Sequence, residues 1–227
     1  KDSSHPSLRI LVTGASGGLG SSLMKELGVN GLGLSRKPAD GIICVEDLES
    51  IFECEHIGQV DAIIHCAWPQ PLNNPLLDSD GDLKTLTEYH LAKPIRECIT
   101  LAKFLKERGT QGAKLILVGS VFSNPGRHAW SYPFYSLSKS LIPTLVKILA
   151  LEFGVSQHKV VGVIFDMLDG GMNSTISKAA KISAMDRNPE GIVPTMDEAA
   201  KNISWVLSNN SSLVSGSIIE LSGGNIP

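Results

Sequence analysis

A tyrosine and a lysine four positions apart are the residues of this 227-residue sequence best suited to chemistry. Tyr135 and Lys139 lie in an apolar segment, where a helix would project both side chains from one face. A phenol with its ordinary pKa of about 10 is a poor base at neutral pH, but a neighbouring ammonium stabilises the phenolate. The pair is therefore suited to exchanging a proton with an alcohol or a carbonyl oxygen.

The same spacing occurs a second time, in Tyr89 and Lys93, so spacing alone does not select the pair. Lys93 is followed by Pro94, which disturbs a helix, whereas Tyr135 is preceded by Ser120 at the end of an apolar strand. A hydroxyl at the carboxyl end of a strand is well placed to hydrogen-bond a reacting oxygen. The alternative interpretation is structural, with a serine that caps a strand end, a tyrosine that starts a helix and a lysine on the surface.

A glycine-rich turn follows the first predicted strand and opens a helix. It reads Thr13-Gly14-Ala15-Ser16-Gly17-Gly18-Leu19-Gly20. Glycines there let the backbone approach a pyrophosphate closely, and the helix N-terminus presents free N–H groups and a partial positive charge. The residues expected to bind a dinucleotide in this turn are Gly14, Ser16, Gly17, Gly18, Leu19 and Gly20. A tight turn without a ligand is the alternative.

The end of the second predicted strand bears on the choice of cofactor. An acidic residue there would bind the adenosine ribose hydroxyls of NAD, whereas a cation would accommodate the 2′-phosphate of NADP. The strand ends in Leu34-Ser35-Arg36-Lys37, without a carboxylate. Ser35 and Arg36 are therefore expected to bind the cofactor and favour NADP, with NAD still possible. The alternative is a solvated loop arginine.

Apolar blocks of strand length alternate with helix-like segments along the chain, as a parallel sheet with crossover helices requires. Strands are predicted at residues 9–13, 31–35, 42–45, 61–66, 114–119, 159–165 and 217–221. Helices are predicted at 19–27, 47–55, 83–108, 135–153 and 197–209. Because no repeat or low-complexity linker interrupts the pattern, we expect one domain over residues 8–227, preceded by a flexible tail at residues 1–7.

Two stretches rich in proline or glycine, 68–82 and 166–194, resist regular assignment. Each follows a predicted strand, and ligands of open α/β sheets lie beyond the carboxyl ends of the strands. These stretches are candidates for loops that enclose a substrate.

Composition excludes several other classes of protein. Lys and Arg number 20 against 23 Asp and Glu, a net charge of −3, so no global basic field would attract nucleic acid or an anionic membrane. No apolar run approaches the roughly 18 residues that cross a bilayer. The four cysteines are too far apart for a paired-thiolate zinc motif, and we expect reduced core residues, no metal, and a cytoplasmic location.

Together these motifs resemble the short-chain dehydrogenase/reductase family over nearly the whole chain. The resemblance extends to Asp47-Leu48 after the third strand and to the closing segment Gly216–Gly224. It implies a Rossmann-type, doubly wound parallel sheet of about seven strands with helices on both faces, and hydride transfer between NAD(P) and an alcohol or ketone. It also implies a dimer or a tetramer.

The resemblance further implies roles for individual residues. Tyr135 would be the general acid/base, Lys139 would lower its pKa and hold the nicotinamide ribose, and Ser120 would position the substrate oxygen. Asp47 and Leu48 would contact the adenine. The cofactor-binding set is completed by Cys66 and Ala67, which follow the fourth strand.

The sequence departs from the family pattern at three places. His65-Cys66-Ala67-Trp68 replaces the usual Asn-Asn-Ala-Gly and is closer to the His-x-Ala form of the longer sugar-nucleotide members. His90 stands where many relatives have an asparagine that binds a relay water; it would relay protons or be a packed helix residue. Phe165–Asn173 replaces the usual Pro-Gly segment, which leaves the nicotinamide side and the substrate pocket undefined.

The sequence thus predicts an NADP-preferring oxidoreductase that acts on a carbonyl or secondary alcohol of a small substrate, with no nucleic-acid or membrane partner. Two alternatives stay open. One is a sugar-nucleotide reductase or epimerase, and the other is a dinucleotide-binding sensor or scaffold without turnover.

Overall fold

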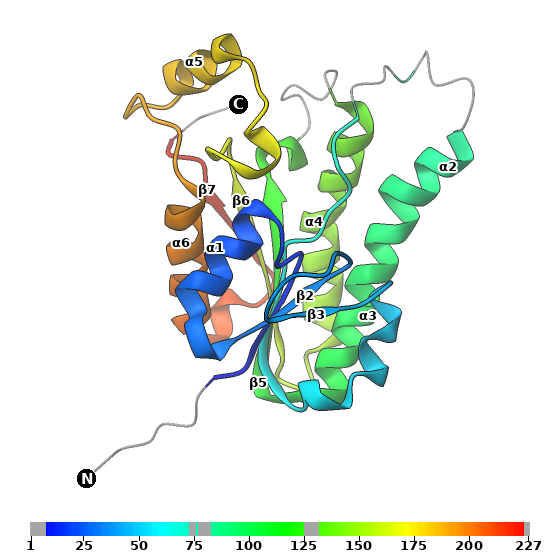
Figure 1. The fold of residues 1–227 in the computed structure, drawn as a ribbon. Coiled ribbons are helices and arrows are strands. Elements are labelled where there is room, and N and C mark those ends of the chain that lie inside the picture. Colours follow the sequence, from blue (N-terminus) through cyan, green and yellow to red (C-terminus); the bar gives the residue numbers. More distant parts are fainter. Residues whose placement is uncertain (1–7, 73–75, 77–82, 125–131, 225–227) are drawn as a thin grey trace.

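A seven-stranded parallel sheet organises the chain (Figure 1). The computed structural model describes residues 8–72, 76, 83–124 and 132–224, so the tail expected at residues 1–7 and most of the stretch 73–82 lie outside it. The strands, in the order in which they pair, are β3 (Ile42–Cys44), β2 (Gly31–Ser35), β1 (Ile10–Thr13), β4 (Val60–His65), β5 (Gly109–Ser120), β6 (Lys159–Phe165) and β7 (Ser217–Leu221). All neighbours pair in parallel, which confirms the predicted doubly wound sheet.

Helices cover both faces of this sheet. Figure 1 shows α1 (Gly18–Leu27) and α6 (Met196–Ser208) on one side and α3 (Lys93–Arg108) and α4 (Pro133–Glu152) on the other. Two apolar clusters separate accordingly, since successive side chains of a strand point to opposite faces. Leu11 of β1 belongs to the cluster under α3 and α4, and Val12 belongs to the cluster under α1 and α6. The central strands are therefore buried on both sides, which explains their unbroken apolar runs.

The segment predicted as a helix at 47–55 is not an α-helix. It forms two short 3₁₀ helices, Glu49–Glu53 and Glu55–Ile57. The Asp47 carboxylate accepts hydrogen bonds from both the backbone N–H and the hydroxyl of Ser50 at 3.0 Å. These local bonds compete with a continuous helix, and the prediction missed them because they leave the apolar pattern unchanged.

A helix also occurs where an irregular stretch was predicted. Helix α5 (Lys178–Arg187) lies within 166–194, and the Ser177 side chain caps it by accepting the Ala180 N–H. Within α5 the structure buries Ala184 alone, so hydrophobic periodicity carried no signal for this helix.

The predicted helix at 83–108 is divided by a wider turn. Helix α2 (Leu83–Thr87) leads through a π-helical turn, Glu88–Ala92, into α3. Pro94 has no N–H to donate to the carbonyl one turn earlier, and its ring crowds that carbonyl. A π turn directly before Pro94 accommodates this mismatch while the axis continues.

Helix α4, with 20 residues, is long and apolar enough to cross a membrane by length and composition. Among the described helices, it is the only one that meets this criterion. The sequence predicted no apolar run of this length, and Lys139 and Lys147 do interrupt the run within α4. Half of the apolar window is buried, and Ile142 and Val146 pack against the sheet. A core helix satisfies the same criterion.

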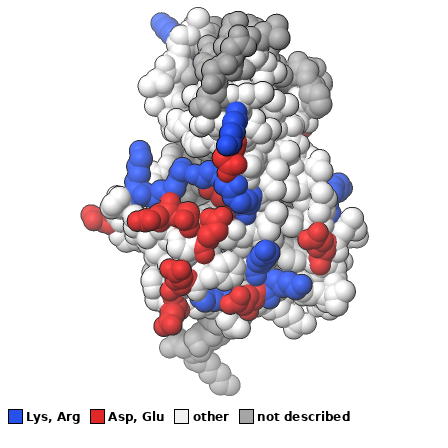
Figure 2. Space-filling view, turned by 90° about the vertical axis from the view of Figure 1, so that its right-hand side faces the viewer, with Lys and Arg blue, Asp and Glu red and all other residues white. Residues whose placement is uncertain are grey.

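Charged side chains of both signs are intermingled on the face shown in Figure 2. Arg96 of α3 forms ion pairs with Glu49 and Glu88. Such mixing leaves no field of a single sign on this face.

A buried lysine of strand β5 binds the carboxyl end of helix α6. The Lys114 ammonium on β5 donates to the carbonyls of Val206, Leu207 and Asn209 at 2.7, 2.8 and 2.8 Å. These carbonyls include the last acceptors of α6, which have no partner inside the helix and carry its negative dipole end. Lys114 is thus tolerated in an apolar strand because its charge caps a helix.

Replacing Lys114 by methionine should lower the free energy of unfolding by about 2–4 kcal/mol, because hydrogen bonds from a charged donor to buried carbonyls are lost. The control is Lys159→Met, since Lys159 is more exposed and donates to one carbonyl, that of Asn210. Denaturant unfolding of both variants measures the difference. Equal, small effects would show that Lys114 is not a structural cap.

Candidate active site

The turn between β1 and α1 has a conformation that only glycine adopts readily. Gly14 has a φ of +69°, and its carbonyl accepts the N–H of Gly17 at 2.9 Å. A Cβ on Gly20 would lie 2.1 Å from the Gly14 carbonyl oxygen, so the turn closes only without one. Ser16 and Gly17 are exposed at the N-terminus of α1, where no side chain in the described chain caps the first turn. The backbone N–H groups there fit an anion such as a pyrophosphate.

Two other segments lie against this turn. A Cβ on Gly14 would lie 2.8 Å from the backbone nitrogen of Ala67, and the Cys66 N–H donates to the Thr13 carbonyl at 3.2 Å. A Cβ on Gly18 would lie 2.6 Å from the Cα of Gly171, in the segment that follows β6. The predicted residues Cys66 and Ala67 are thus brought beside the glycine turn, and Gly18 permits a close backbone approach that sequence reasoning did not anticipate.

The residues predicted for the adenosine side lie near the same turn. The hydroxyls of Ser16 and Ser35 are 2.6 Å apart, and the Ser35 hydroxyl also accepts the Lys37 N–H. Arg36 is exposed. It lies close enough to α3 for its charge to act on buried Glu97, whose pKa burial nonetheless raises. A cation is therefore available at this position.

Asp47 and Leu48, the other two predicted adenine contacts, differ in exposure. Asp47 is exposed and its carboxylate holds the turn at Ser50, whereas the Leu48 side chain is buried in the core cluster under α3. Any contact of Leu48 with a nucleotide would therefore involve its backbone.

Ser120, Tyr135 and Lys139 come together at the carboxyl end of β5. Ser120 is the last residue of this strand, Tyr135 lies in the first turn of α4, and Lys139 follows one turn later. Tyr135 is hydrogen-bonded with Ser120, and the Lys139 Nζ lies 5.7 Å from the centre of the Tyr135 ring. Tyr135 is 8% exposed and Lys139 is 5% exposed.

Local contacts hold this group in place. The Ser120 hydroxyl accepts the Phe122 N–H at 3.4 Å and so caps the 3₁₀ turn Val121–Ser123. The Phe122 ring packs edge-on against Tyr135 at 5.7 Å and against Tyr132 at 6.1 Å. The Lys139 ammonium donates to the Val118 carbonyl at 2.9 Å. Strand β5 therefore supplies both the hydroxyl and the carbonyl that orient the two helix residues.

Burial dominates the electrostatics of this group. It raises the pKa of Tyr135 to about 12, while the hydrogen bond with Ser120 acts in the opposite direction. It lowers the pKa of Lys139 to about 7. The spacing of Tyr135 and Lys139 predicted a lowered phenol pKa, and that direction is wrong here because desolvation penalises the phenolate. The phenol is protonated at neutral pH and so is set up to donate a proton.

Trp68 belongs to this site, although sequence reasoning gave it no role. Its ring lies 4.5 Å from the Lys139 Nζ, and its indole N–H donates to the Ser138 hydroxyl at 2.8 Å. The signal that pointed to it was its position after His65-Cys66-Ala67, where the family pattern has glycine. Tryptophan at that position adds a large ring beside the lysine.

His90 is fully buried in the π turn between the rings of Tyr89 and Phe134. Among the described residues, neither of its ring nitrogens has a hydrogen-bond partner. Burial lowers its pKa, so the imidazole is neutral. This position agrees with the interpretation of His90 as a packed helix residue. A role for His90 in relaying protons stays a prediction.

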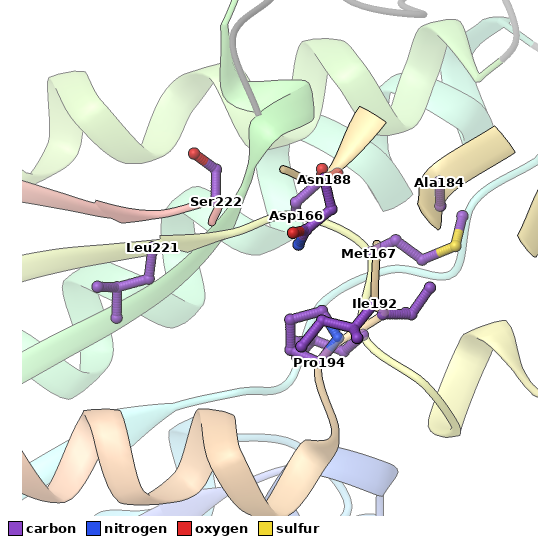
Figure 3. A pocket seen from close by; sticks show the side chains of 10 residues that line it. Asp166, Met167, Ala184, Asn188, Ile192, Pro194, Leu221 and Ser222 are labelled. Carbon is purple, nitrogen blue, oxygen red and sulfur yellow. The ribbon is translucent and has the colours of Figure 1, made fainter. Parts of the chain in front are cut away.

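A separate small pocket lies at the ends of β6 and β7, beside α5 (Figure 3). In Figure 3, Met167 extends toward Ala184, and Asn188 lies beside Asp166. Ser120, Tyr135 and Lys139 do not line it. Asp169 holds this region together: its carboxylate pairs with Lys181 at 2.8 Å and its N–H donates to the Pro194 carbonyl. Eight residues of the stretch 166–194 thus line this pocket.

Comparisons with known proteins agree with this arrangement. Residues 45–225 match the family model described as enoyl-(acyl carrier protein) reductase. The L-xylulose reductase of Bos taurus is 28% identical over 95% of both chains. The 3-oxoacyl-(acyl-carrier-protein) reductase MabA of Mycobacterium tuberculosis is 24% identical over 95% of this chain and 91% of its own. A solved short-chain dehydrogenase/reductase of Serratia marcescens has a TM-score of 0.82 at 19% identity, covering 97% of this chain and 99% of that chain.

The doubly wound sheet with a glycine turn after its first strand defines the class of α/β dinucleotide-binding proteins. Because the family model covers most of the chain, the chain belongs to the short-chain dehydrogenase/reductase family of oxidoreductases, which bind NAD(P). This confirms the resemblance found in the sequence.

Replacing Gly14 by alanine should cost much more than replacing Gly41, although the two have nearly equal φ angles of +69° and +71°. At Gly41, no atom of the described residues other than its chain neighbours lies within 4 Å of an added Cβ, so the expected cost is backbone strain, about 1–2 kcal/mol. At Gly14 the added Cβ also meets the Ala67 backbone, which adds about 1–3 kcal/mol. Thermal unfolding measures both. Equal costs would mean that the close approach is relieved by movement of the 66–67 backbone.

Proposed function

We propose that this protein transfers hydride between NADP(H) and the carbonyl or secondary alcohol of a small substrate. The grouping of Ser120, Tyr135 and Lys139 at the carboxyl end of β5, on the same edge of the sheet as the glycine turn, carries the proposal. A pure dinucleotide sensor needs no phenol with a buried ammonium and a hydroxyl beside it.

In the reducing direction, NADPH held at the glycine turn would be the source of the hydride that the carbonyl carbon accepts. Tyr135 donates its proton to the carbonyl oxygen, which gives the alcohol and leaves a phenolate. Ser120 donates a hydrogen bond to the same oxygen as negative charge develops on it. The Lys139 ammonium stabilises the phenolate until it takes a proton from solvent. A protonated phenol with a raised pKa suits this direction.

The glycine turn would hold the pyrophosphate through Ser16, Gly17, Gly18 and Leu19, whose backbone lies at the N-terminus of α1. Ser35 and Arg36 would contact the adenosine 2′-phosphate, because an exposed guanidinium forms strong charge-assisted hydrogen bonds with phosphate. NADP preference rests on this cation at the end of β2.

Replacing Arg36 by alanine should weaken NADPH binding about tenfold to hundredfold, since a charged hydrogen bond contributes about 1.5–3 kcal/mol. NADH, which lacks the 2′-phosphate, is the internal control and should bind nearly as before. Fluorescence titration with both nucleotides measures the ratio. Parallel losses for the two nucleotides would contradict NADP preference.

A small ketone is the substrate class that the site and the relatives favour together. Two of the relatives are named for the reduction of a carbonyl, in a sugar and in an acyl thioester respectively. The rings of Phe122 and Tyr132 next to Tyr135 supply apolar surface for the groups that flank a carbonyl. We therefore propose a ketone of small size with moderately apolar flanks.

Tyr135→Phe should lower kcat by about 100-fold or more, because the proton donor is lost, while NADPH binding stays nearly intact. Tyr89→Phe is the matched control: it removes the hydroxyl of the other tyrosine that precedes a lysine by four residues and should leave turnover unchanged. A panel of ketones, aldoses and nucleotide-sugars followed by NADPH absorbance measures both. Full turnover by Tyr135→Phe would overturn the assignment. Tight NADPH binding without NADPH oxidation by any compound would favour a dinucleotide sensor. Turnover of nucleotide-sugars alone would favour a sugar-nucleotide reductase or epimerase.

A homodimer or homotetramer is the proposed assembly. The outer face of α4 exposes Leu137, Ile148 and Leu151, the last of them 83% exposed, and Ile99 of α3 is partly exposed as well. Exposed apolar side chains on two long helices are typical of a surface that a second copy covers.

A further inference from the structure

The Lys139 ammonium is a buried charge with an unusual set of neighbours. Its Nζ donates to the Val118 carbonyl at 2.9 Å and faces the Trp68 ring at 4.5 Å from the ring centre. The face of an indole carries partial negative charge and attracts a cation, more strongly when water is excluded. Trp68 is therefore a direct electrostatic partner of this ammonium.

The Trp68 ring is held from two sides. Its N–H donates to the hydroxyl of Ser138 at 2.8 Å, directly before Lys139 on α4. The Trp68 and His65 rings pack edge to face, with 5.7 Å between their centres. The His65 Nδ1 in turn lies 2.7 Å from the hydroxyl of Thr13, at the start of the glycine turn. The indole is thus anchored to β1, β4 and α4 and presents a fixed ring to the lysine.

The titratable groups around Lys139 offer no competing negative charge at neutral pH. From the end of β4, His65 has a pKa lowered to about 3 by burial and by the charge of Lys139, so it is neutral. Burial raises the thiol pKa of Cys66 on the same segment and of Cys98 on α3 to about 12. Tyr135, on the same helix as Lys139, is a neutral phenol. Among the described residues, no carboxylate acts on the Lys139 pKa.

We infer that Trp68 is a positioning residue, whose ring face keeps the Lys139 ammonium charged and directed at the Val118 carbonyl beside Tyr135. The consequence for turnover rests on the proposed function, because a charged Lys139 is what would stabilise the Tyr135 phenolate. The effect of the Trp68 ring on the Lys139 ammonium concerns the protein alone and can be measured without turnover.

The test is the pKa of Lys139 in the protein labelled with ¹³C-lysine, read from the chemical shift of its Cε over a pH titration. Lys139→Arg identifies the signal by removing it. Trp68→Leu removes the ring face that stabilises the ammonium, so the Lys139 pKa should fall by about half a unit or more. Trp68→Phe keeps a ring and should retain most of the wild-type value.

Two further variants make the result decisive. Trp205→Leu removes an exposed tryptophan of α6 and should leave the Lys139 titration unchanged. Trp68→Met is a second variant without a ring, since its unbranched side chain fills irregular space and preserves packing. An unchanged Lys139 pKa in both ring-free variants would overturn the inference. Equal shifts in the Phe and Leu variants would overturn it too, because they would assign the effect to the indole N–H.

Kinetics then separate this inference from the proposed function. With a charged Lys139 required for reduction, the alkaline limb of the kcat/KM profile of Trp68→Leu should move to lower pH by the same shift, and kcat should fall more than KM rises. A shifted Lys139 pKa in a protein that reduces no substrate would leave the inference standing and defeat the proposed function. A shifted Lys139 pKa with an unmoved kinetic limb would show that Trp68 does not act on turnover through Lys139.

Discussion

The parallel pairing of β1, β4 and β5 is the constraint on which the site depends. Thr13 pairs with His65, and His65 pairs with Leu117, so β1 and β4 end at the same level, opposite Leu117 of β5. Beyond that line each strand continues differently: β1 enters the glycine turn, β4 leads to Cys66-Ala67-Trp68, and β5 extends to Ser120. A shift of one residue in either pairing would turn the side chains to the opposite face. The register therefore places the glycine turn, the Trp68 ring and the Ser120 hydroxyl at one edge of the sheet.

Burial gives this edge its chemistry. In water, a tyrosine and a lysine one helical turn apart would keep nearly ordinary pKa values. Packed between β5, α3 and the segment after β4, the phenol is held protonated and the ammonium loses most of its hydration. Among the described residues, the charge is compensated by the Val118 carbonyl and the nearby Trp68 ring, with the Tyr135 ring further away at 5.7 Å. The same principle appears at the opposite end of the sheet, where Lys114 is stabilised by the carbonyls that end α6.

Two of the segments that depart from the family pattern contact residues of the candidate site. Trp68 follows β4, and the segment with Gly170 and Gly171 follows β6; the first covers Lys139 and the second approaches the glycine turn at Gly18. A Cβ on Gly18 would lie 2.6 Å from the Gly171 Cα, so this approach requires glycine at position 18, while the φ of +56° favours glycine at position 171. These two departures therefore lie beside Lys139 and beside the glycine turn.

Local pattern determined the alternation of strands and helices, the glycine turn, and the candidate residues Ser120, Tyr135 and Lys139, because apolar periodicity and glycine conformation are properties of short segments. It did not determine the 3₁₀ turns after Asp47, the helix α5 or the π turn before Pro94, which depend on local hydrogen bonds that leave the apolar pattern intact. Only the tertiary structure decided that the phenol pKa rises instead of falling, and that Trp68 lies over Lys139. Both result from long-range packing, since desolvation and ring contacts arise only when distant segments exclude water from the same small volume.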